Sequence, residues 1–115
     1  MGSEWGRAAA RLLLNDGAAF DAVICQNDVL ARGCIEELER NGCRVPQDVA
    51  VIGHDNSPDY VSYAHPLLTS IDDNNEMLGR QAALCLLDAI AGHPHHGVER
   101  VPVKLIQRES TLPLD

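Results

Sequence analysis

The chain has 115 residues, a length that suits a single domain. Its 9 Lys and Arg against 17 Asp and Glu give a formal net charge of −8, so the chain by itself is a poor partner for a nucleic-acid backbone. Its 45% content of apolar residues is typical of a globular protein, and no apolar run approaches the roughly 18 residues of a membrane span. Residues 1–3 have the composition of a cloning remnant, and we expect no secretory signal because no basic residues precede an apolar stretch.

Hydrophobic spacing predicts a layered α/β fold that contains a parallel β-α-β unit with a right-handed crossover. Helical segments show an apolar period, and short continuous apolar runs predict strands covered on both faces. The expected elements are a helix at 5–15, a strand at 22–25, a helix at 29–41, a strand at 49–52, a polar loop at 54–65, a strand at 69–71, a helix from 74 or 75 to 91 and a strand at 99–107. Pro102 should confine the last strand to an edge of the sheet.

The cysteines are best interpreted as free thiols. Their gaps of nine, nine and forty-two residues match no zinc-site template, and none forms a C-x-x-C pair. They are Cys25, Cys34, Cys43 and Cys85. Free thiols predict a cytosolic protein.

A histidine cluster lies between Gly92 and Gly97, at His93, His95 and His96. Its sequence neighbours offer no acidic or cysteine ligand at a recognised spacing, so we predict a solvated turn and no metal site. Adventitious binding of nickel or zinc stays open.

Polar side chains follow each of the first three predicted strands, where open parallel sheets bind ligands. The segments are Gln26-Asn27-Asp28, Gly53-His54-Asp55-Asn56 and Asp72-Asp73-Asn74. Their carboxylate and amide oxygens accept hydrogen bonds, so sugars, polyols or nucleosides would suit the site. Phosphates would not, because no glycine-rich loop or lysine accompanies these residues. No cofactor is predicted.

Other interpretations of these residues stay open. Asp and Asn after strands often form turns or helix N-caps, and we expect Asp28 and Asn74 to act as caps. A hard cation such as calcium would also accept these oxygens, although the spacing of a calcium loop is absent. His54 and Asp55 could form an acid/base pair, but adjacent strand residues point to opposite faces. No catalytic motif is present, so we do not predict an enzyme.

Five segments in chain order resemble bacterial lactose/galactose-repressor (LacI/GalR) family regulators. Residues 21–33 (DAVICQNDVLARG) resemble "AIFAANDxxAxG", 45–56 (VPQDVAVIGHDN) resemble "VPxDVSVVGFDD", 65–71 (HPLLTSI) resemble "PPLTTV", 78–83 (LGRQAA) resemble "LGRRAA", and 108–111 (REST) resemble "RxST". The resemblance covers over three quarters of the chain, from about Asp21 to Thr111.

The resemblance implies a periplasmic-binding-protein-like core in which a small effector lies between two lobes, with residues 1–115 as part of the C-terminal lobe. Such a lobe is Rossmann-like, with helices and a parallel sheet in three layers. The resemblance implies further that Asn27 and Asp55 face the effector. Asp73 falls where relatives often carry Gln, His54 where an aromatic residue is usual, and Asn56 where Asp is common.

The resemblance also implies a homodimer interface. It would be built on residues 29–41 and 60–63, through Leu30, Cys34, Tyr60 and Tyr63, with plain core packing as the alternative. The helix-turn-helix, the hinge and the N-terminal lobe of such regulators are not in this sequence, so DNA would be bound only by domains outside it. We also expect an unprotected sheet edge, and therefore dimerisation or strand exchange.

The sequence thus predicts the effector-binding and dimerisation portion of a cytoplasmic transcriptional regulator, whose effector is a sugar or another small polar molecule. A periplasmic sugar-binding receptor of a transporter shares the fold and is the alternative. The free cysteines and the ending at 108–111 favour the regulator. A small α/β hydrolase using Asp55 and His54 is a third interpretation.

Overall fold

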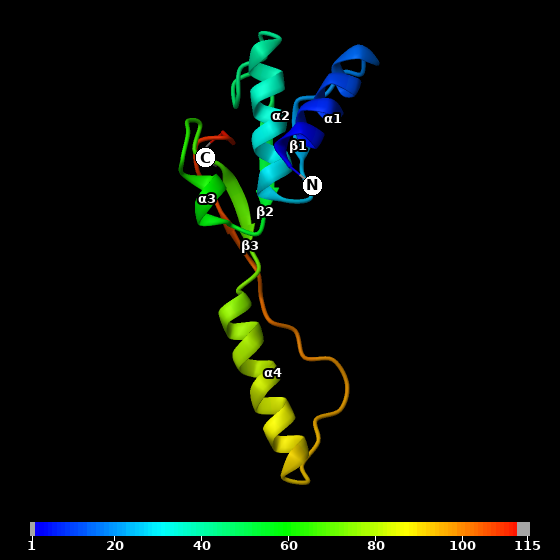
Figure 1. The fold of residues 1–115 in the computed structure, drawn as a ribbon, viewed down its shortest axis with the longest axis vertical. Coiled ribbons are helices and arrows are strands. Elements are labelled where there is room, and N and C mark those ends of the chain that lie inside the picture. Colours follow the sequence, from blue (N-terminus) through cyan, green and yellow to red (C-terminus); the bar gives the residue numbers. More distant parts are fainter. Residues whose placement is uncertain (1, 113–115) are drawn as a thin grey trace.

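A computed structural model describes residues 2–112 as four helices and four strands in alternation. The elements are α1 (Ser3–Asn15), β1 (Ala22–Ile24), α2 (Asp28–Arg40), β2 (Ala50–His54), α3 (Pro58–Val61), β3 (Thr69–Asp72), α4 (Asn75–Ile90) and β4 (Lys104–Ile106). The sheet order is β1-β2-β3-β4, with β1, β2 and β3 parallel and β4 antiparallel to β3 (Figure 1). The predicted α/β class and the parallel β1–α2–β2 unit are confirmed.

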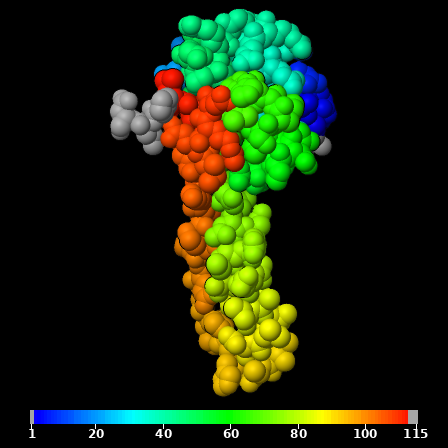
Figure 2. Space-filling model, turned by 90° about the vertical axis from the view of Figure 1, so that its left-hand side faces the viewer, coloured from blue at the N-terminus to red at the C-terminus, as the bar shows by residue number. Residues whose placement is uncertain are grey.

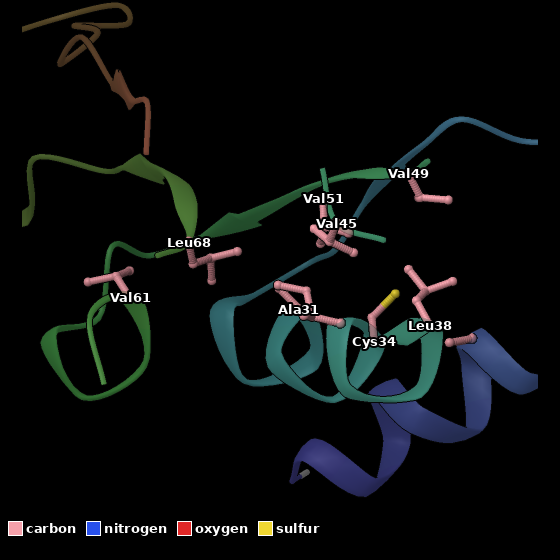
Figure 3. Packing of buried hydrophobic residues seen from close by; sticks show 10 residues of the cluster. Ala31, Cys34, Leu38, Val45, Val49, Val51, Val61 and Leu68 are labelled. Carbon is pink, nitrogen blue, oxygen red and sulfur yellow. The ribbon is translucent and has the colours of Figure 1, made fainter. Parts of the chain in front are cut away.

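The core lies between α2 and the sheet. Side chains of Ala31, Cys34 and Leu38 on α2 face Val51 on β2 (Figure 3). The buried apolar residues are Ala10, Ala31, Cys34, Ile35, Leu38, Val45, Val49, Val51, Val61 and Leu68. In β2 burial alternates, so Val51 and Gly53 are buried while their neighbours are only partly covered. Within the described residues, helices therefore cover only one face of this strand, and the expectation that both faces would be covered was wrong.

Helix α1 packs directly on α2 because two glycines let the backbones meet. A Cβ atom at Gly6 would strike the carbonyl oxygen of Leu30, and one at Gly33 would strike the carbonyl oxygen of Ser3. Ion pairs flank this contact, with Arg7 Nη1 2.9 Å from Glu36 Oε2 and an Arg11–Glu37 pair beside it. Both helices thus stack on the same side of the sheet.

The other face of the sheet is open within residues 2–112. Ile24 on β1 is 77% exposed, and β1 is an edge strand. The described residues therefore form two of the three predicted layers, because no described helix packs against this second face.

Helix α4 projects away from the sheet, and residues 92–103 run back beside it (Figures 1 and 2). None of its residues is buried, so the predicted apolar stripe has no covering partner in the described chain. The molecule is accordingly elongated, 60 × 31 × 25 Å. No helix among the described residues is both long and apolar enough to cross a membrane.

Two predictions about local structure were wrong. The expected loop at 54–65 contains the short helix α3, which begins with Pro58 in its first turn. The strand expected at 99–107 is reduced to Lys104–Ile106, because the chain before it, including Pro102, runs beside α4 and makes no ladder. β4 does lie at the edge of the sheet, as Pro102 led us to expect.

Candidate functional site

His54 joins two of the predicted ligand residues at the carboxyl ends of the parallel strands. Its Nδ1 lies 3.1 Å from Asp55 Oδ1, and its Nε2 lies 3.0 Å from Asp73 Oδ1. All three side chains remain open to solvent, with exposed fractions of 37% for His54, 54% for Asp55 and 26% for Asp73. The expectation that His54 and Asp55 would point apart was wrong, because Asp55 leaves the strand with a φ of 102°. The polar residues that follow β2 and β3 thus lie together at one edge of the sheet, as predicted.

Asn27 makes no hydrogen bond to this cluster, and its predicted contact with the effector stays a prediction. It is the N-cap of α2, and its Oδ1 accepts a hydrogen bond of 2.9 Å from the backbone N–H of Leu30. A backbone N–H only donates, so this bond fixes which atom of the amide is oxygen. Toward a ligand, Nδ2 could donate, and the second lone pair of Oδ1 could still accept.

Asp28 has a structural role in place of the expected N-cap. Only 1% exposed, it accepts hydrogen bonds from the backbone N–H of Ser57 at 2.7 Å and from the hydroxyl of Ser70 at 2.6 Å. Gly53 is required beside it, because a Cβ there would strike the Asp28 carboxylate. One carboxylate thereby fixes the chain after β1, the chain after β2 and the middle of β3, which positions the polar edge.

A second network holds the opposite side of this edge. Asn56 donates from Nδ2 to Asp72 Oδ2 at 3.0 Å and accepts from Arg108 Nη2 at 2.7 Å. The backbone N–H of Asn74 donates to Asp72 at 2.8 Å, and this bond, followed by that from Asn56, lowers the pKa of the Asp72 carboxyl. Asn74 occupies the N-cap position of α4, but its side chain makes no capping bond, so the expected cap was wrong.

The terminal segment 108–111 contributes side chains whose function the residue pattern alone did not reveal. Arg108 also donates to the carbonyl oxygen of Leu68 at 2.8 Å. Ser110, fully buried, donates to the carbonyl oxygen of Val51 at 2.6 Å and accepts from the backbone N–H of Thr69 at 2.8 Å. The only signal for these roles in the sequence was the family-like ending, because the partners lie about 40 to 60 residues away along the chain.

A shallow hollow lies beside the cluster on the open face of the sheet. Its volume is about 420 Å³, and it is lined by Ile24, Cys25, Gln26, His54 and Ile71. His54 is the residue that both lines this hollow and contacts the two carboxylates. The edge therefore offers an apolar floor with imidazole and carboxylate groups at its rim, an arrangement suited to a ligand with both ring carbons and hydroxyls.

The same cluster is also the place near this edge that could hold a cation. His54, Asp55 and Asp73 each offer one ligand atom, and these atoms lie within 4.8 Å of one another. All of them are nitrogen or oxygen, so the hard-cation interpretation raised by the sequence keeps a geometric basis here.

The predicted interface residues separate into two groups. Leu30 and Cys34 lie beneath α1, where they line a small apolar hollow, and Cys34 is 3% exposed. Burial under α1 keeps Cys34 away from a partner, whereas Leu30 is only partly buried and its interface role stays a prediction. Cys34 also shares a hydrogen bond with Cys25, and this bond is the main cause of the raised pKa of the Cys25 thiol. All four cysteines are free thiols, as predicted.

Tyr60 and Tyr63 lie together around a buried arginine that sequence reasoning missed. Arg32, 2% exposed, donates to the carbonyl oxygens of Tyr60, Val61 and Pro66 at 2.5, 3.0 and 2.8 Å. Its guanidinium carbon lies 5.0 Å from the centre of the Tyr63 ring, which meets the Tyr60 ring edge to face. Burial lowers the pKa of Arg32. Tyr63 is 59% exposed and so presents an aromatic surface on a rigid base.

The chain is similar in sequence to one protein family and to curated transcriptional regulators. Residues 2–111 match the family described as the periplasmic binding protein-like domain. The HTH-type transcriptional regulator CelR of Thermobifida fusca is 38% identical over 106 residues, which cover 91% of this chain and 31% of that protein. The chain thus spans about a third of this relative's length.

Solved structures agree. A complex of a transcriptional regulator CelR with cellobiose superposes with a TM-score of 0.81 at 36% identity, covering 96% of this chain and 34% of that one. The lac repressor dimer bound to operator and the anti-inducer ONPF superposes with a TM-score of 0.89 at 30% identity, covering 97% of this chain and 39% of that one. The chain belongs to the periplasmic-binding-protein-like domain family, on the branch of the LacI-type transcriptional regulators.

Proposed function

We propose that this chain is part of the effector-binding domain of a cytoplasmic LacI-type transcriptional regulator, and that its effector is a sugar or a similar polyhydroxylated molecule. The observation that carries the proposal is the cluster of His54, Asp55 and Asp73 beside an apolar hollow. Carboxylates accept hydrogen bonds from sugar hydroxyls, and the apolar floor suits the carbon faces of the ring. The solved CelR relative is a complex with cellobiose, which supports the same class of ligand.

Binding would need surfaces that this chain does not supply. Its ligand edge is open, and α4 carries exposed leucines on a helix with no buried residue. An exposed apolar surface of this kind favours a covering partner. We propose that the rest of the regulator covers α4 and closes the cleft, so that effector binding shifts the equilibrium between two arrangements of the domains. DNA would be bound by domains outside this chain.

The proposed homodimer interface now depends on Tyr60 and Tyr63. Tyr63 is exposed, and Arg32 donates to the carbonyl oxygen of Tyr60 while its guanidinium lies over the Tyr63 ring. Aromatic side chains held on a rigid base lose little conformational entropy when a partner covers them. Leu30 and Cys34 are not part of this proposal.

We propose binding and no catalysis at this edge. In the described part of the chain, the hydrogen bonds of His54 go only to carboxylates, and none joins it to a serine or cysteine side chain. The curated relatives of this chain, CelR and CytR among them, are transcriptional regulators.

A titration of the complete protein with a panel of mono- and disaccharides, cellobiose among them, tests the proposal. For any sugar that binds, Asp55→Asn and Asp73→Asn should each weaken binding by about 10-fold to 100-fold, the value of a hydrogen bond to a charged group. Asp59→Asn, on exposed α3, is the matched control and should leave affinity unchanged. Failure of every sugar to bind, or full affinity in both site variants, would overturn the proposal.

The coding sequence upstream of this chain separates the regulator from the transport receptor. We expect a helix-turn-helix and a first lobe in the same reading frame. A signal peptide followed by a first lobe would instead make the protein a periplasmic receptor.

A further inference from the structure

The return of residues 92–103 beside α4 brings together side chains that are far apart in sequence. Cys85 and Asp88 lie on α4, while His95 and Glu99 lie on the returning segment. One ligand atom each from Cys85, His95 and Glu99 falls within 4.8 Å of the others. From these contacts we propose that Cys85, His95 and Glu99 form a binding site for a zinc-type divalent cation, separate from the effector edge.

The chemistry of the donor set is that of a transition-metal site. Thiolate sulfur, imidazole nitrogen and carboxylate oxygen are the ligands that zinc takes in proteins. The thiol distinguishes this cluster from His54, Asp55 and Asp73, which offer only nitrogen and oxygen. Three protein ligands would leave a fourth position for water.

The distances between the donor atoms already approach those of a tetrahedral site. Zinc bond lengths place nitrogen and oxygen ligands roughly 3.3 Å apart, and sulfur roughly 3.6 Å from either. His95 Nδ1 lies 3.0 Å from Glu99 Oε1, and Cys85 Sγ lies 3.6 Å from Glu99 Oε2. The two distances run to different oxygens of Glu99, so the thiol and the imidazole, whose ligand atoms lie within 4.8 Å of each other, would have to close around one cation.

Asp88 supplies a partner that orients the imidazole. Its Oδ2 lies 2.6 Å from His95 Nε2, the ring nitrogen that does not face Glu99. Metal-bound histidines commonly donate their second N–H to a carboxylate, which fixes the ring and strengthens it as a ligand. The Asp88–His95 pair thus has the geometry of such a support.

The electrostatics of the cluster also favour a cation. The hydrogen bonds that the His95 ring makes to the Asp88 and Glu99 carboxylates raise the pKa of His95. Desolvation and the Glu99 carboxylate raise the pKa of the Cys85 thiol. A cation would displace both protons, so affinity for it should rise with pH.

Titration of the chain with Co²⁺, a spectroscopic stand-in for zinc, under a thiol-free reductant tests this site. We expect a thiolate-to-cobalt absorption band that saturates at one ion per chain. Cys85→Ser should abolish the band and Cys43→Ser, at another half-buried thiol, should keep it. His95→Gln should likewise weaken binding far more than His96→Gln, and Asp88→Asn should weaken it by about 10-fold to 100-fold.

Circular dichroism of each variant checks that the fold is kept, which is expected because α4 contributes no residue to the core. The absence of a thiolate band at saturating Co²⁺, or a band that persists in Cys85→Ser, would overturn the proposal. Equal losses in His95→Gln and His96→Gln would show adventitious binding to the histidine cluster, which also overturns it.

Discussion

The carboxylate of Asp28 accepts a hydrogen bond from the hydroxyl of Ser70 at 2.6 Å, and both side chains are buried. The bond ties the first turn of α2 to the centre of β3. It shows that a residue beside the ligand edge can be polar for structural reasons. The ends of the parallel strands hold their relative positions through this contact.

Removing the Ser70 hydroxyl should destabilise the protein. Ser70→Ala leaves one Asp28 oxygen buried without its partner, which costs about 1–3 kcal/mol. Urea denaturation would measure the change in the free energy of unfolding, with exposed Ser62→Ala as the control. Equal stability of the two variants would show that the Asp28–Ser70 bond does not support the fold.

The two glycines between α1 and α2 should be intolerant of a methyl group. Gly33→Ala would drive a Cβ into the backbone carbonyl of Ser3, and relief requires the helices to separate. We expect a loss of at least about 1–3 kcal/mol. Gly79→Ala on α4 is the matched control, because nothing lies within 4 Å of its new Cβ and it should gain about 0.5–1 kcal/mol of helix propensity.

The contact between Arg44 and Asp48 should stabilise the fold in a pH-dependent way. Hydrogen bonds from the Arg44 side chain and backbone lower the pKa of Asp48 from 3.8 to about 2. A carboxyl with a lowered pKa contributes its stability above the unfolded value and loses it as the pH falls toward the folded value. The contribution is therefore present at pH 5 and lost between about pH 4 and pH 2.

The free energy of unfolding of the native protein and of Asp48→Asn, measured by urea denaturation at pH 5 and at pH 2, would check the effect. The native protein should be the more stable at pH 5, and the difference should shrink at pH 2. A difference that stays constant across this range would contradict the assigned ion pair.

Tyr63 should contribute more to dimerisation than to folding. Its ring is largely exposed, so Tyr63→Ala removes little beyond a cation–π contact with Arg32 and an edge-to-face contact with Tyr60, about 0.5–1.5 kcal/mol each. In the complete protein we expect a dimer dissociation constant at least about 10-fold higher, the loss of a moderate interface anchor. Sedimentation would measure this dissociation constant. Trp5→Ala is the control, because Trp5 is also an exposed aromatic residue but lies on α1. An unchanged constant would place the interface elsewhere.

Sequence patterns predicted the elements whose stabilising contacts are local or periodic. Apolar runs located β1 and β2, and the apolar period located α2, although its N-cap is Asn27 and not the expected Asp28. Helix α3 was missed because its four residues carry no apolar period. The last strand was predicted too long because the alternation of 101, 103 and 105 does not reveal that residues 92–103 follow α4.

The candidate site was predictable where its position depends only on the order and direction of the strands. The rule that parallel strands end at one edge brought Asp55 and Asp73 together. It could not show that His54 bridges them, because the contact depends on the positive φ of Asp55. The roles of Arg32 and of Cys85 with Glu99 depend on contacts between distant segments, which no local pattern records.

The central claim is that a sugar bound at Asp55 and Asp73 controls DNA binding by the complete protein. The most direct test is the dissociation constant for a DNA fragment selected from a random library, measured with and without the sugar that binds. We expect the sugar to change this constant by about 5-fold to 150-fold, and Asp55→Asn to remove the change while sugar-free DNA affinity stays the same. A DNA affinity that does not respond to the bound sugar, or no DNA selected at all, would contradict it.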